Sequence, residues 1–485
     1  MRNSSSNNKD PSRDRSPVRT TTRTHMRLRK TPGAGRIARA VLGAWLAVGL
    51  QATASAQGQT DLLAVYSDAL ERNPQYRADA AQYHAAQQLV PAAFGKMLPQ
   101  IGLRARYEHI WEKIDGQYYN VQNFSFDDDY DRHGYGGVLQ QVIYNGALWA
   151  DLDAARLRVA QAGFALEGRQ DALGVQVVEN YFAALGAEEG LRYANAEVET
   201  LRQESEQASA RADAGLALEA DKQVALAAYE LALARQAEAR SLVESTKLQL
   251  ESLTGKRYGA LKLLPADVAL ELPQPMDENA WIERARTHNA FVLARTAGLE
   301  VARKELVSAR RERWPRLNAL GQAFWDDHGG GVVGEREEEE QRIGLVLDLP
   351  IYSGGQVSAR IEANKAGVTG AEALLEQARA EAVQATRQAY LTITTGLLKA
   401  QGLKRAVDAA NAAEQATRAA YEAGTRTNAD LLQAIGTRYD AERNYALIRY
   451  RILHASVQLR AASGTLVTAD LIGLNRQLQA GELTP

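Results

Sequence analysis

The feature that most limits the fold of this chain is an internal repeat. The segments that match between the two halves are Asn73 with Asn289, Leu98-Pro99-Gln100 with Trp314-Pro315-Arg316, Tyr144-Asn145-Gly146 with Tyr352-Ser353-Gly354, Ala214-Gly215 with Ala423-Gly424, and Thr254-Gly255 with Ser463-Gly464. The spacing is 216 residues for the first two pairs, 208 for the third and 209 for the last two. A length difference confined to one place is typical of a surface loop. The period is far too long for a solenoid, and it indicates a duplicated structural unit.

Each half has the same predicted order of elements: a helix, two strands around a loop, a very long helix, a turn and a returning helix. In the first half the opening helix is predicted over 60–96. We therefore expect a first structural repeat over 57–272. A second repeat, followed by a C-terminal equatorial segment, is expected over 273–485.

One strand in each half alternates between apolar and polar residues. The apolar positions are Ile101, Leu103, Ala105, Tyr107 and Trp111 in the first half and Ile343, Leu345, Leu347, Leu349 and Ile351 in the second. A strand between lipid and water has this pattern, and so does a half-buried strand in a soluble sandwich, so the strands alone leave both open. Segments 131–145 and 317–326 alternate less cleanly. The runs at 127–129, 329–331 and 335–340 are predicted to be solvated loops between paired strands.

The predicted long helices contain no proline over 147–213 and 356–422, and each would be about 100 Å long. Coiled-coil seams with 3-4-3-4 spacing are predicted at Val198, Leu201, Ser205, Ala208 and Ala212, and at Ala406, Ala409, Ala413, Ala416 and Ala420. Because alanine lets helices approach closely, this bias favours a thin-walled helical tube over a solid core. A long coiled coil without a pore would also fit the helices, but it would leave the strands unexplained.

The N-terminus has the features of an export signal. Residues 2–39 carry eleven Lys or Arg, residues 40–50 are apolar, and Ala54-Ser55-Ala56 has the small-x-small pattern of a cleavage site. We predict a signal peptide over 1–56, with Met26 as an alternative start. A membrane anchor would need about 20 apolar residues. The chain has no cysteine, which excludes a lipid-anchored N-terminal cysteine as well as disulfides.

Composition and motifs argue against catalysis and nucleic-acid binding. Loss of 1–56 would reduce Lys and Arg from 57 to 46 and Asp and Glu from 59 to 57, which leaves an acidic chain. There is no Walker loop, HExxH or GxSxG. The GxGxxG string at 329–334 precedes acidic residues that would repel a pyrophosphate. The seven histidines are scattered. We expect no catalytic residue, no metal, no cofactor and no enzymatic activity.

The chain resembles the TolC family of outer-membrane export factors over roughly 60–475. The segments that carry the resemblance are Asn73-Pro74, Leu98-Pro99-Gln100, Leu253-Thr254-Gly255, Leu349-Pro350-Ile351-Tyr352-Ser353-Gly354-Gly355, Tyr421-Glu422-Ala423-Gly424-Thr425-Arg426-Thr427 and Ala462-Ser463-Gly464-Thr465-Leu466. The resemblance implies an α+β membrane protein that forms a homotrimer. Four strands per chain would give a trimeric twelve-stranded β-barrel in the outer membrane of a Gram-negative bacterium, continuous with a long periplasmic α-helical coiled-coil tunnel.

The resemblance also implies a gate where the helical hairpins end. It maps the gate onto Asp221, Tyr421 and Arg426. The tip turns that would contact an adaptor contain Gly215 and Leu216 in the first half and Gly424 and Thr425 in the second. It places an acidic ring of the pore at Asp430. Gln433 and Ala220 replace a second acid and a hydroxyl partner of the family, so we expect weaker cation selectivity than a two-acid entrance gives.

The function implied by the resemblance is that of a passive exit duct. Its partners would be two further copies of the chain, a periplasmic adaptor, an inner-membrane ABC transporter or proton-driven pump, and outer-membrane lipid. Type I protein secretion is favoured over small-molecule efflux because many drug-efflux relatives carry the lipid-anchor cysteine that is missing here. A structural periplasmic coiled coil is the remaining alternative.

Overall fold

The structure, a computed structural model, describes residues 59–118, 122–265 and 268–478. The chain divides into two units, 1–56 and 57–485, and every described residue lies in the second. The predicted signal peptide over 1–56, with its alternative start at Met26, lies outside the described residues.

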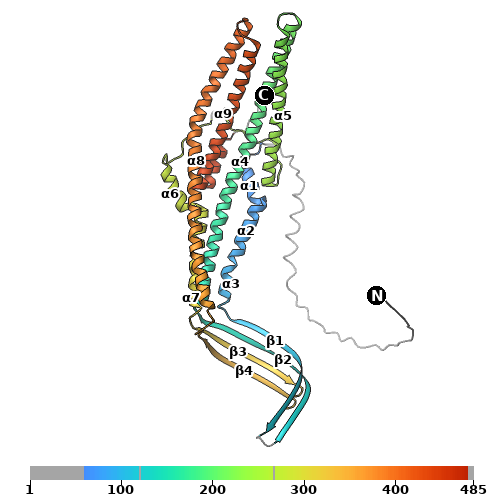
Figure 1. Ribbon diagram of the computed structural model, residues 1–485, viewed down its shortest axis with the longest axis vertical. Helices are drawn as coiled ribbons and strands as arrows, with labels where there is room; N and C mark the ends of the chain where they lie inside the picture. Colours follow the sequence, from blue (N-terminus) through green and yellow to red (C-terminus); the bar gives the residue numbers. More distant parts are fainter. Residues whose placement is uncertain (1–58, 119–121, 266–267, 479–485) are drawn as a thin grey trace, which may run out of the picture. The chain divides into compact units, whose positions relative to one another are not determined.

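The order of the elements repeats between the halves (Figure 1). The first half contains α1 (Leu62–Arg72), α2 (Pro74–Gln87), α3 (Leu89–Gly95), β1 (Gln100–Tyr118), β2 (Gln122–Asn145), α4 (Gly146–Asp213) and α5 (Glu219–Thr254). The second half contains α6 (Glu278–His288), α7 (Ala290–Arg311), β3 (Arg316–His328), β4 (Arg336–Asp348), α8 (Gln356–Glu422), α9 (Asn428–Ala462) and α10 (Thr468–Arg476). The two long helices therefore match the proline-free segments to within one residue at each end.

The prediction of one opening helix over 60–96 is wrong, because this segment forms α1, α2 and α3. The first break is at Asn73, whose side chain accepts a hydrogen bond from the Tyr76 N–H at 2.9 Å, while Pro74 occupies the first position of α2. In the second half Asn289 caps α7 in the same way.

Asn73 and Asn289 also join each of these helices to the end of a long hairpin. The Asn73 side-chain amide donates to the Leu253 carbonyl at 3.0 Å, and that of Asn289 donates to the Ala462 carbonyl at 2.9 Å. The asparagine recurs at this position because each half uses the same contact between two helices. At each joint an amide caps the start of one helix and satisfies a free carbonyl at the end of another.

The strands form one antiparallel sheet in the order β1-β2-β3-β4 (Figure 1). Segments 131–145 and 317–326 are parts of β2 and β3. The prediction that the acidic runs are loops is wrong. Residues 127–129 lie in β2 and pair with residues 111–113 of β1, and residues 337–340 lie in β4. The strand predicted to reach Ile351 ends at Asp348, shortly before Pro350, which has no N–H to donate to a ladder.

One face of the sheet exposes its large apolar side chains. Leu103 is 91% exposed and Ile343 is 94% exposed, and Leu345 and Leu347 lie on the same face. The opposite face is polar and includes an ion pair between Arg106 and Asp326 at 2.6 Å. A half-buried strand of a soluble sandwich would cover the apolar residues. Nothing in the described part of the chain does so, and lipid fits this face better.

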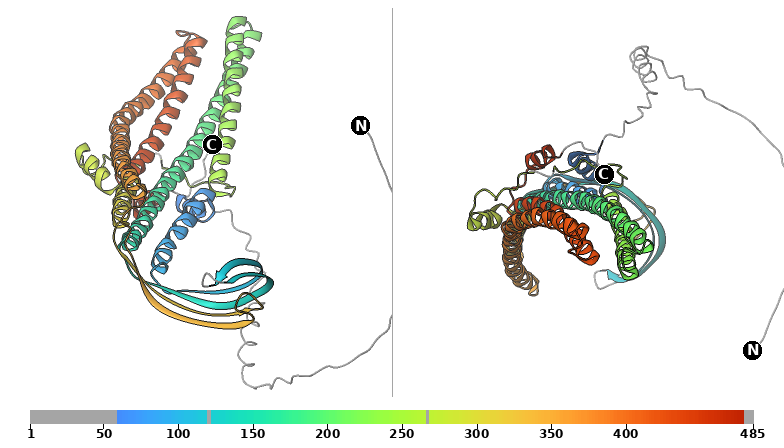
Figure 2. Two further views of the ribbon diagram at one scale, coloured as in Figure 1. Left: turned by 60° about the horizontal axis from the view of Figure 1, so that its bottom comes forward. Right: turned by 90° about the horizontal axis from the view of Figure 1, so that it is seen from above.

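The long helices stand side by side in an arc, in the order α8, α9, α4 and α5, as Figure 2 shows from above. None of the described helices combines the length and the apolar composition that crossing a bilayer requires. In α4 the predicted seam is buried at Leu201 and Ala208. In α8 it is not, because Ala406, Ala409, Ala413 and Ala416 are exposed.

Gly464, just past the end of α9, should tolerate substitution poorly. Its φ is +68°, and a Cβ there would lie 2.2 Å from the His288 carbonyl oxygen. Gly255 has a φ of +66° but nothing within 4 Å of an added Cβ, so it is a matched control for the backbone strain alone. We expect Gly464→Ala to lower the free energy of unfolding by about 1–3 kcal/mol more than Gly255→Ala. Thermal melts followed by circular dichroism would measure the difference, and equal losses would contradict the contact.

Candidate functional site

The two helical hairpins end in matching turns. Gly215 and Gly424 have φ of +72° and +74°. The residue after each glycine donates its N–H to a carbonyl in the last turn of the preceding helix. Leu216 donates to the Arg211 carbonyl at 2.7 Å, and Thr425 donates to the Ala420 carbonyl at 2.9 Å. Left-handed glycines with such bonds end a helix compactly. Leu216 is 80% exposed, so the first turn leaves an apolar side chain uncovered within the chain.

Each predicted gate residue has a partner other than the other two. The Tyr421 ring packs against the Arg211 guanidinium, 5.0 Å from the ring centre. The Asp221 carboxylate accepts from the Leu218 N–H at 3.4 Å. Among the described residues no ion pair joins Arg426 to Asp221. The gate assignment therefore stays a prediction.

Asn428, which the sequence analysis did not identify, links the two turns directly. Its side-chain amide donates to the Asp221 carbonyl oxygen at 3.2 Å, and its side chain is almost fully buried. Asn428 is the first residue of α9, and Asp221 lies in the first turn of α5. The sequence signal was weak, because a polar residue at a helix start is usually read as a local cap.

Asp430, the predicted ring residue, lies in the first turn of α9. Its carboxylate accepts from the Thr427 N–H at 3.0 Å and from the Thr427 hydroxyl at 2.9 Å. Arg426 Nη1 lies 4.0 Å from the carboxylate. The backbone hydrogen bond from Thr427, more than the arginine, lowers the pKa of Asp430 below its ordinary value. The carboxylate is therefore ionised at neutral pH.

A chain of ion pairs behind the tip connects three helices, and we call it the hairpin network. Glu204 on α4 pairs with Arg418 on α8, and Arg418 Nη2 reaches Glu414 at 3.1 Å. Glu414 also pairs with Arg438 on α9, whose other nitrogen lies 3.3 Å from Glu442. The Glu204 side chain is only 6% exposed. The network thus ties the second hairpin to the first through charges that are partly shielded from water.

Sequence reasoning missed the hairpin network although two signals were present. Glu197 and Glu204 are seven residues apart on α4 and both are buried, so acids occupy positions beside the predicted seam. Glu414 and Arg418 have the spacing of a pair on one helix face. What the sequence did not provide was the partner helix of each charge.

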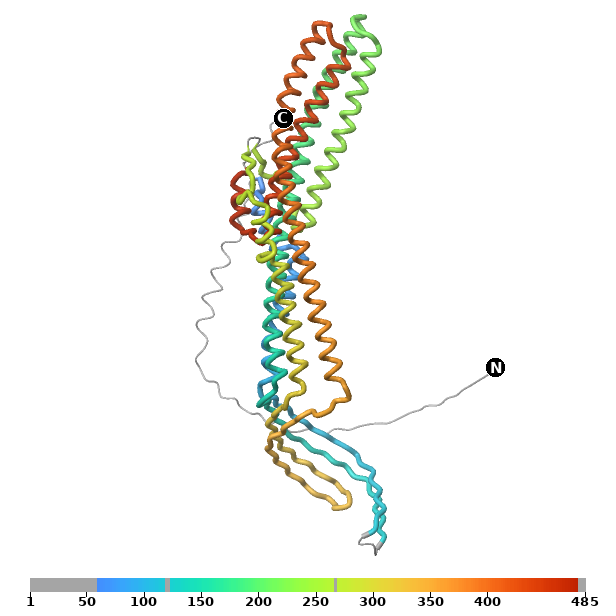
Figure 3. Tube along the Cα trace, turned by 60° about the vertical axis from the view of Figure 1, so that its left-hand side comes forward, coloured from blue at the N-terminus to red at the C-terminus, as the bar shows by residue number. Residues whose placement is uncertain are grey.

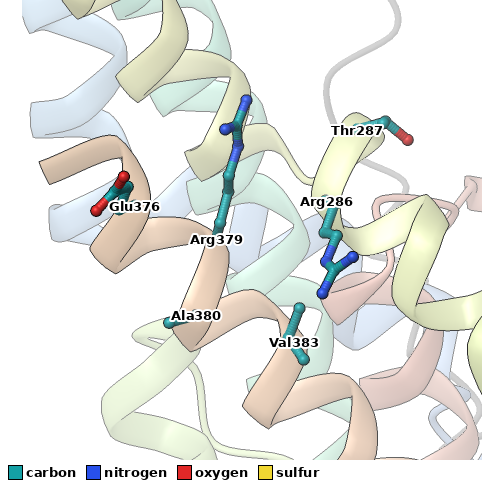
Figure 4. A pocket seen from close by; sticks show the side chains of 6 residues that line it. All are labelled: Arg286, Thr287, Glu376, Arg379, Ala380 and Val383. Carbon is teal, nitrogen blue, oxygen red and sulfur yellow. The ribbon is translucent and has the colours of Figure 1, made fainter. Parts of the chain in front are cut away.

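A hollow of about 580 Å³ between α6 and α8 lies apart from the tip. Figure 4 shows that the Arg286 and Arg379 guanidinium groups point in opposite directions, so they do not converge on one ligand. In the part of the chain that the structure describes, no group of three His, Asp or Glu side chains could hold a metal ion.

Comparisons with known proteins agree on one class. The family described as outer membrane efflux protein matches residues 65–256 and 281–465. Outer membrane protein TolC of Escherichia coli is 28% identical, over 86% of this chain and 85% of that protein. Alkaline protease secretion protein AprF of Pseudomonas aeruginosa is 26% identical, over 87% and 88% respectively. The crystal structure of the outer membrane protein VceC of Vibrio cholerae matches with a TM-score of 0.70 at 17% identity, over 83% of this chain and 96% of that one.

Proposed function

Because the chain belongs to the outer membrane efflux protein family, we propose that it is the outer-membrane duct of a type I protein secretion system. Members of this family are channels of the outer membrane and not enzymes. The chain is accordingly an exit channel of the outer membrane with a large periplasmic helical part. The finer assignments concern its assembly, its gate and its cargo.

We propose that the channel is a homotrimer. The sheet has two edges, β1 and β4, that lack a partner strand within the described residues. Four strands are too few for a barrel, whereas three copies supply twelve and leave no edge exposed. The arc of α8, α9, α4 and α5 then supplies one third of the tunnel wall (Figure 2).

The observation that carries the proposal of protein secretion is the similarity to AprF along nearly the whole of both chains, since that relative is named for secretion of a protease. The absence of cysteine, and hence of a lipid anchor, favours the same assignment. Efflux of small molecules is the second candidate, and the family's description favours it. In both cases an inner-membrane ABC transporter or proton-driven pump would supply the energy, and a periplasmic adaptor would connect it to the channel.

A deletion strain separates the two candidates. We expect loss of this gene to remove specific proteins from the culture medium while minimal inhibitory concentrations of drugs and dyes stay within twofold. A plasmid copy of the gene should restore secretion. Unchanged secretion together with a large gain in drug susceptibility would favour efflux instead. Neighbouring genes for an ABC transporter and an adaptor would support the first outcome.

At the tunnel entrance we propose that Asp430 of each copy forms one acidic ring. Asp430→Asn should then reduce the preference for cations severalfold, whereas Asp440→Asn, on the same helix, should not. A carboxyl with a lowered pKa keeps its charge until the pH falls through that pKa. Selectivity should therefore persist at pH 5 and be lost only below about 3.8, the ordinary value. Reversal potentials in planar bilayers measure this, and anion preference in the unmodified channel would refute the ring.

A further inference from the structure

The apolar face of the sheet, which we call the lipid face, ends in aromatic side chains beside the helices. Leu347, on that face, pairs with Leu317, and Leu317 pairs in turn with Tyr144. Residues directly opposite each other in an antiparallel sheet project on the same side, so Tyr144 also belongs to the lipid face. Trp314 lies next to it and is 46% exposed. Figure 3 shows this border, where α7 ends and α4 begins at the sheet.

Arg311, in the last turn of α7, packs against this aromatic group. A Cβ added at Gly146 would lie 3.1 Å from the Trp314 ring and 3.4 Å from Arg311 Cδ. The Tyr144 hydroxyl would lie 3.5 Å from the same position. The Arg311 guanidinium lies 5.3 Å from the centre of the Trp314 ring, and its Nη1 donates to the Gly146 carbonyl at 3.2 Å. These contacts hold the guanidinium at the end of the lipid face.

The chain does not neutralise the cations at this border. Within the described residues no Asp or Glu forms an ion pair with Arg310, Arg311 or Arg313. The one acid of the segment, Glu312, pairs instead with Arg360 on α8 at 2.8 Å. We call Arg310, Arg311 and Arg313 the border arginines. Together they present three positive charges beside an apolar surface.

The first half of the chain places apolar residues at the matching border. At the spacing of 216 residues, Phe94 corresponds to Arg310 and Leu98 corresponds to Trp314. Phe94 is 48% exposed and Leu98 is 45% exposed. The duplicated position therefore fits the edge of the membrane in both halves, and only the second half presents arginines there.

The border arginines lie at the depth of the lipid headgroups. A bilayer is about 30 Å thick in its hydrocarbon core and about 40–45 Å with its headgroups, so each headgroup layer is about 5–8 Å thick. Exposed tryptophan and tyrosine side chains mark the boundary of the core. Arg310 and Arg311 precede Trp314 by four and three residues, which is about 6 and 5 Å at the rise of a helix. Because the helices are periplasmic, this layer belongs to the periplasmic leaflet, which consists of phospholipid.

We propose that the border arginines bind the phosphate groups of anionic phospholipids in the periplasmic leaflet of the outer membrane. Guanidinium groups bind phosphate oxygens through paired hydrogen bonds. Arg313 is oriented for this by the hydrogen bond from its Nη2 to the Ser358 hydroxyl at 3.0 Å. Three cations without a carboxylate favour phosphatidylglycerol over phosphatidylethanolamine, whose ammonium group they would repel. The inference rests on the outer-membrane location of the channel and is independent of its cargo.

Native mass spectrometry of the purified protein tests the preference. From mixed micelles with equal amounts of phosphatidylglycerol and phosphatidylethanolamine of the same acyl chains, we expect at least threefold more phosphatidylglycerol to be retained. The triple variant Arg310→Gln, Arg311→Gln, Arg313→Gln should retain the two lipids equally. Equal retention by the unmodified protein, or an unchanged preference in the triple variant, would overturn the proposal.

Arg295→Gln is the matched control. Arg295 is also exposed on α7, and no carboxylate among the described residues pairs with it. It lies about 24 Å along the helix from Arg311, outside the headgroup layer. The variant should therefore retain the lipid preference of the unmodified protein. An equal loss in Arg295→Gln and in the triple variant would show that overall charge, and not the border, selects the lipid.

Fluorescence quenching locates the bound lipid in the unmodified fold. Brominated acyl chains quench only the tryptophans that they contact, and the contribution of Trp314 is the difference between the unmodified protein and Trp314→Phe. In liposomes of the two lipids, this contribution should be quenched at least twice as strongly when phosphatidylglycerol carries the bromine. Equal quenching would overturn the site. If the unmodified protein forms trimers and pores but shows neither preference, only the headgroup inference fails and the proposed function stands.

Discussion

Replacing Arg418 with alanine is expected to raise the single-channel conductance several-fold by freeing the periplasmic end of the tunnel. Arg418 is the residue of the hairpin network through which α8 holds α4. Without it Glu204 lies buried without its cation. Charge-assisted hydrogen bonds are worth about 1.5–3 kcal/mol each, and a shift of about 1.4 kcal/mol changes an equilibrium tenfold. If the tip is closed by one such link in each of the three proposed copies, it should therefore open measurably.

Arg202→Ala is the matched control for this prediction. Arg202 lies two residues from Glu204 on α4, but its partners Glu199 and Glu206 are on the same helix. Its removal leaves the contacts between helices intact, so conductance should not change. The two variants would be compared in planar bilayers, with uptake of a large antibiotic by living cells as a second measure. If Arg418→Ala conducts no better than Arg202→Ala, the hairpin network does not hold the tip.

Replacing Arg449 with methionine should destabilise the fold more than any other single change considered for this chain. Arg449 on α9 is 3% exposed and lies 3.1 Å from Glu189 on α4. Its Nη1 donates to the Pro265 carbonyl at 2.8 Å. Removing one partner of a buried pair typically costs about 3–5 kcal/mol. The remaining cation beside Glu189 is then Arg192, one turn along α4 and 3.5 Å away. Chemical unfolding in detergent, followed by circular dichroism, would measure the loss.

Two further variants identify the cause of that loss. The double variant Arg449→Met, Glu189→Gln removes both charges, and it should recover much of the stability because no lone charge stays buried. Lys247→Met breaks the neighbouring pair with Glu188, which is 2.8 Å long but more exposed, and should cost at most about 1 kcal/mol. A double variant as unstable as Arg449→Met alone would show that lost packing, and not the charge, is responsible.

The repeat made the fold largely predictable from the sequence. Long proline-free segments, glycines after each hairpin and alternating strands are local signals, and the structure confirms α4, α8, the tip turns and the start of β1. The predictions were wrong where the structure of a segment depends on its pairing with another segment and not on its own composition. The acidic run at 127–129 has the composition of a loop, yet it lies in β2 and pairs with residues 111–113 of β1.

The site was less predictable because its contacts join helices that are distant in sequence. The resemblance pointed to the two hairpin turns, whose role stays a prediction, but Asn428 and the hairpin network depend on which helix stands beside which. Residues 204 and 418 are more than two hundred positions apart, and no spacing rule connects them. The alanine seam of α8 is likewise exposed at four of its five predicted positions, Ala406, Ala409, Ala413 and Ala416. Single-chain periodicity could not tell whether such a seam faces a neighbour, another copy or water.

The central claim, that the chain is a trimeric channel of the outer membrane, is tested most directly by recording single channels from the unmodified protein purified from outer membranes. The preparation should run as a trimer that dissociates to monomers on heating, and its pores should be cation-selective. A monomeric preparation that produces no conductance steps in planar bilayers would contradict the claim.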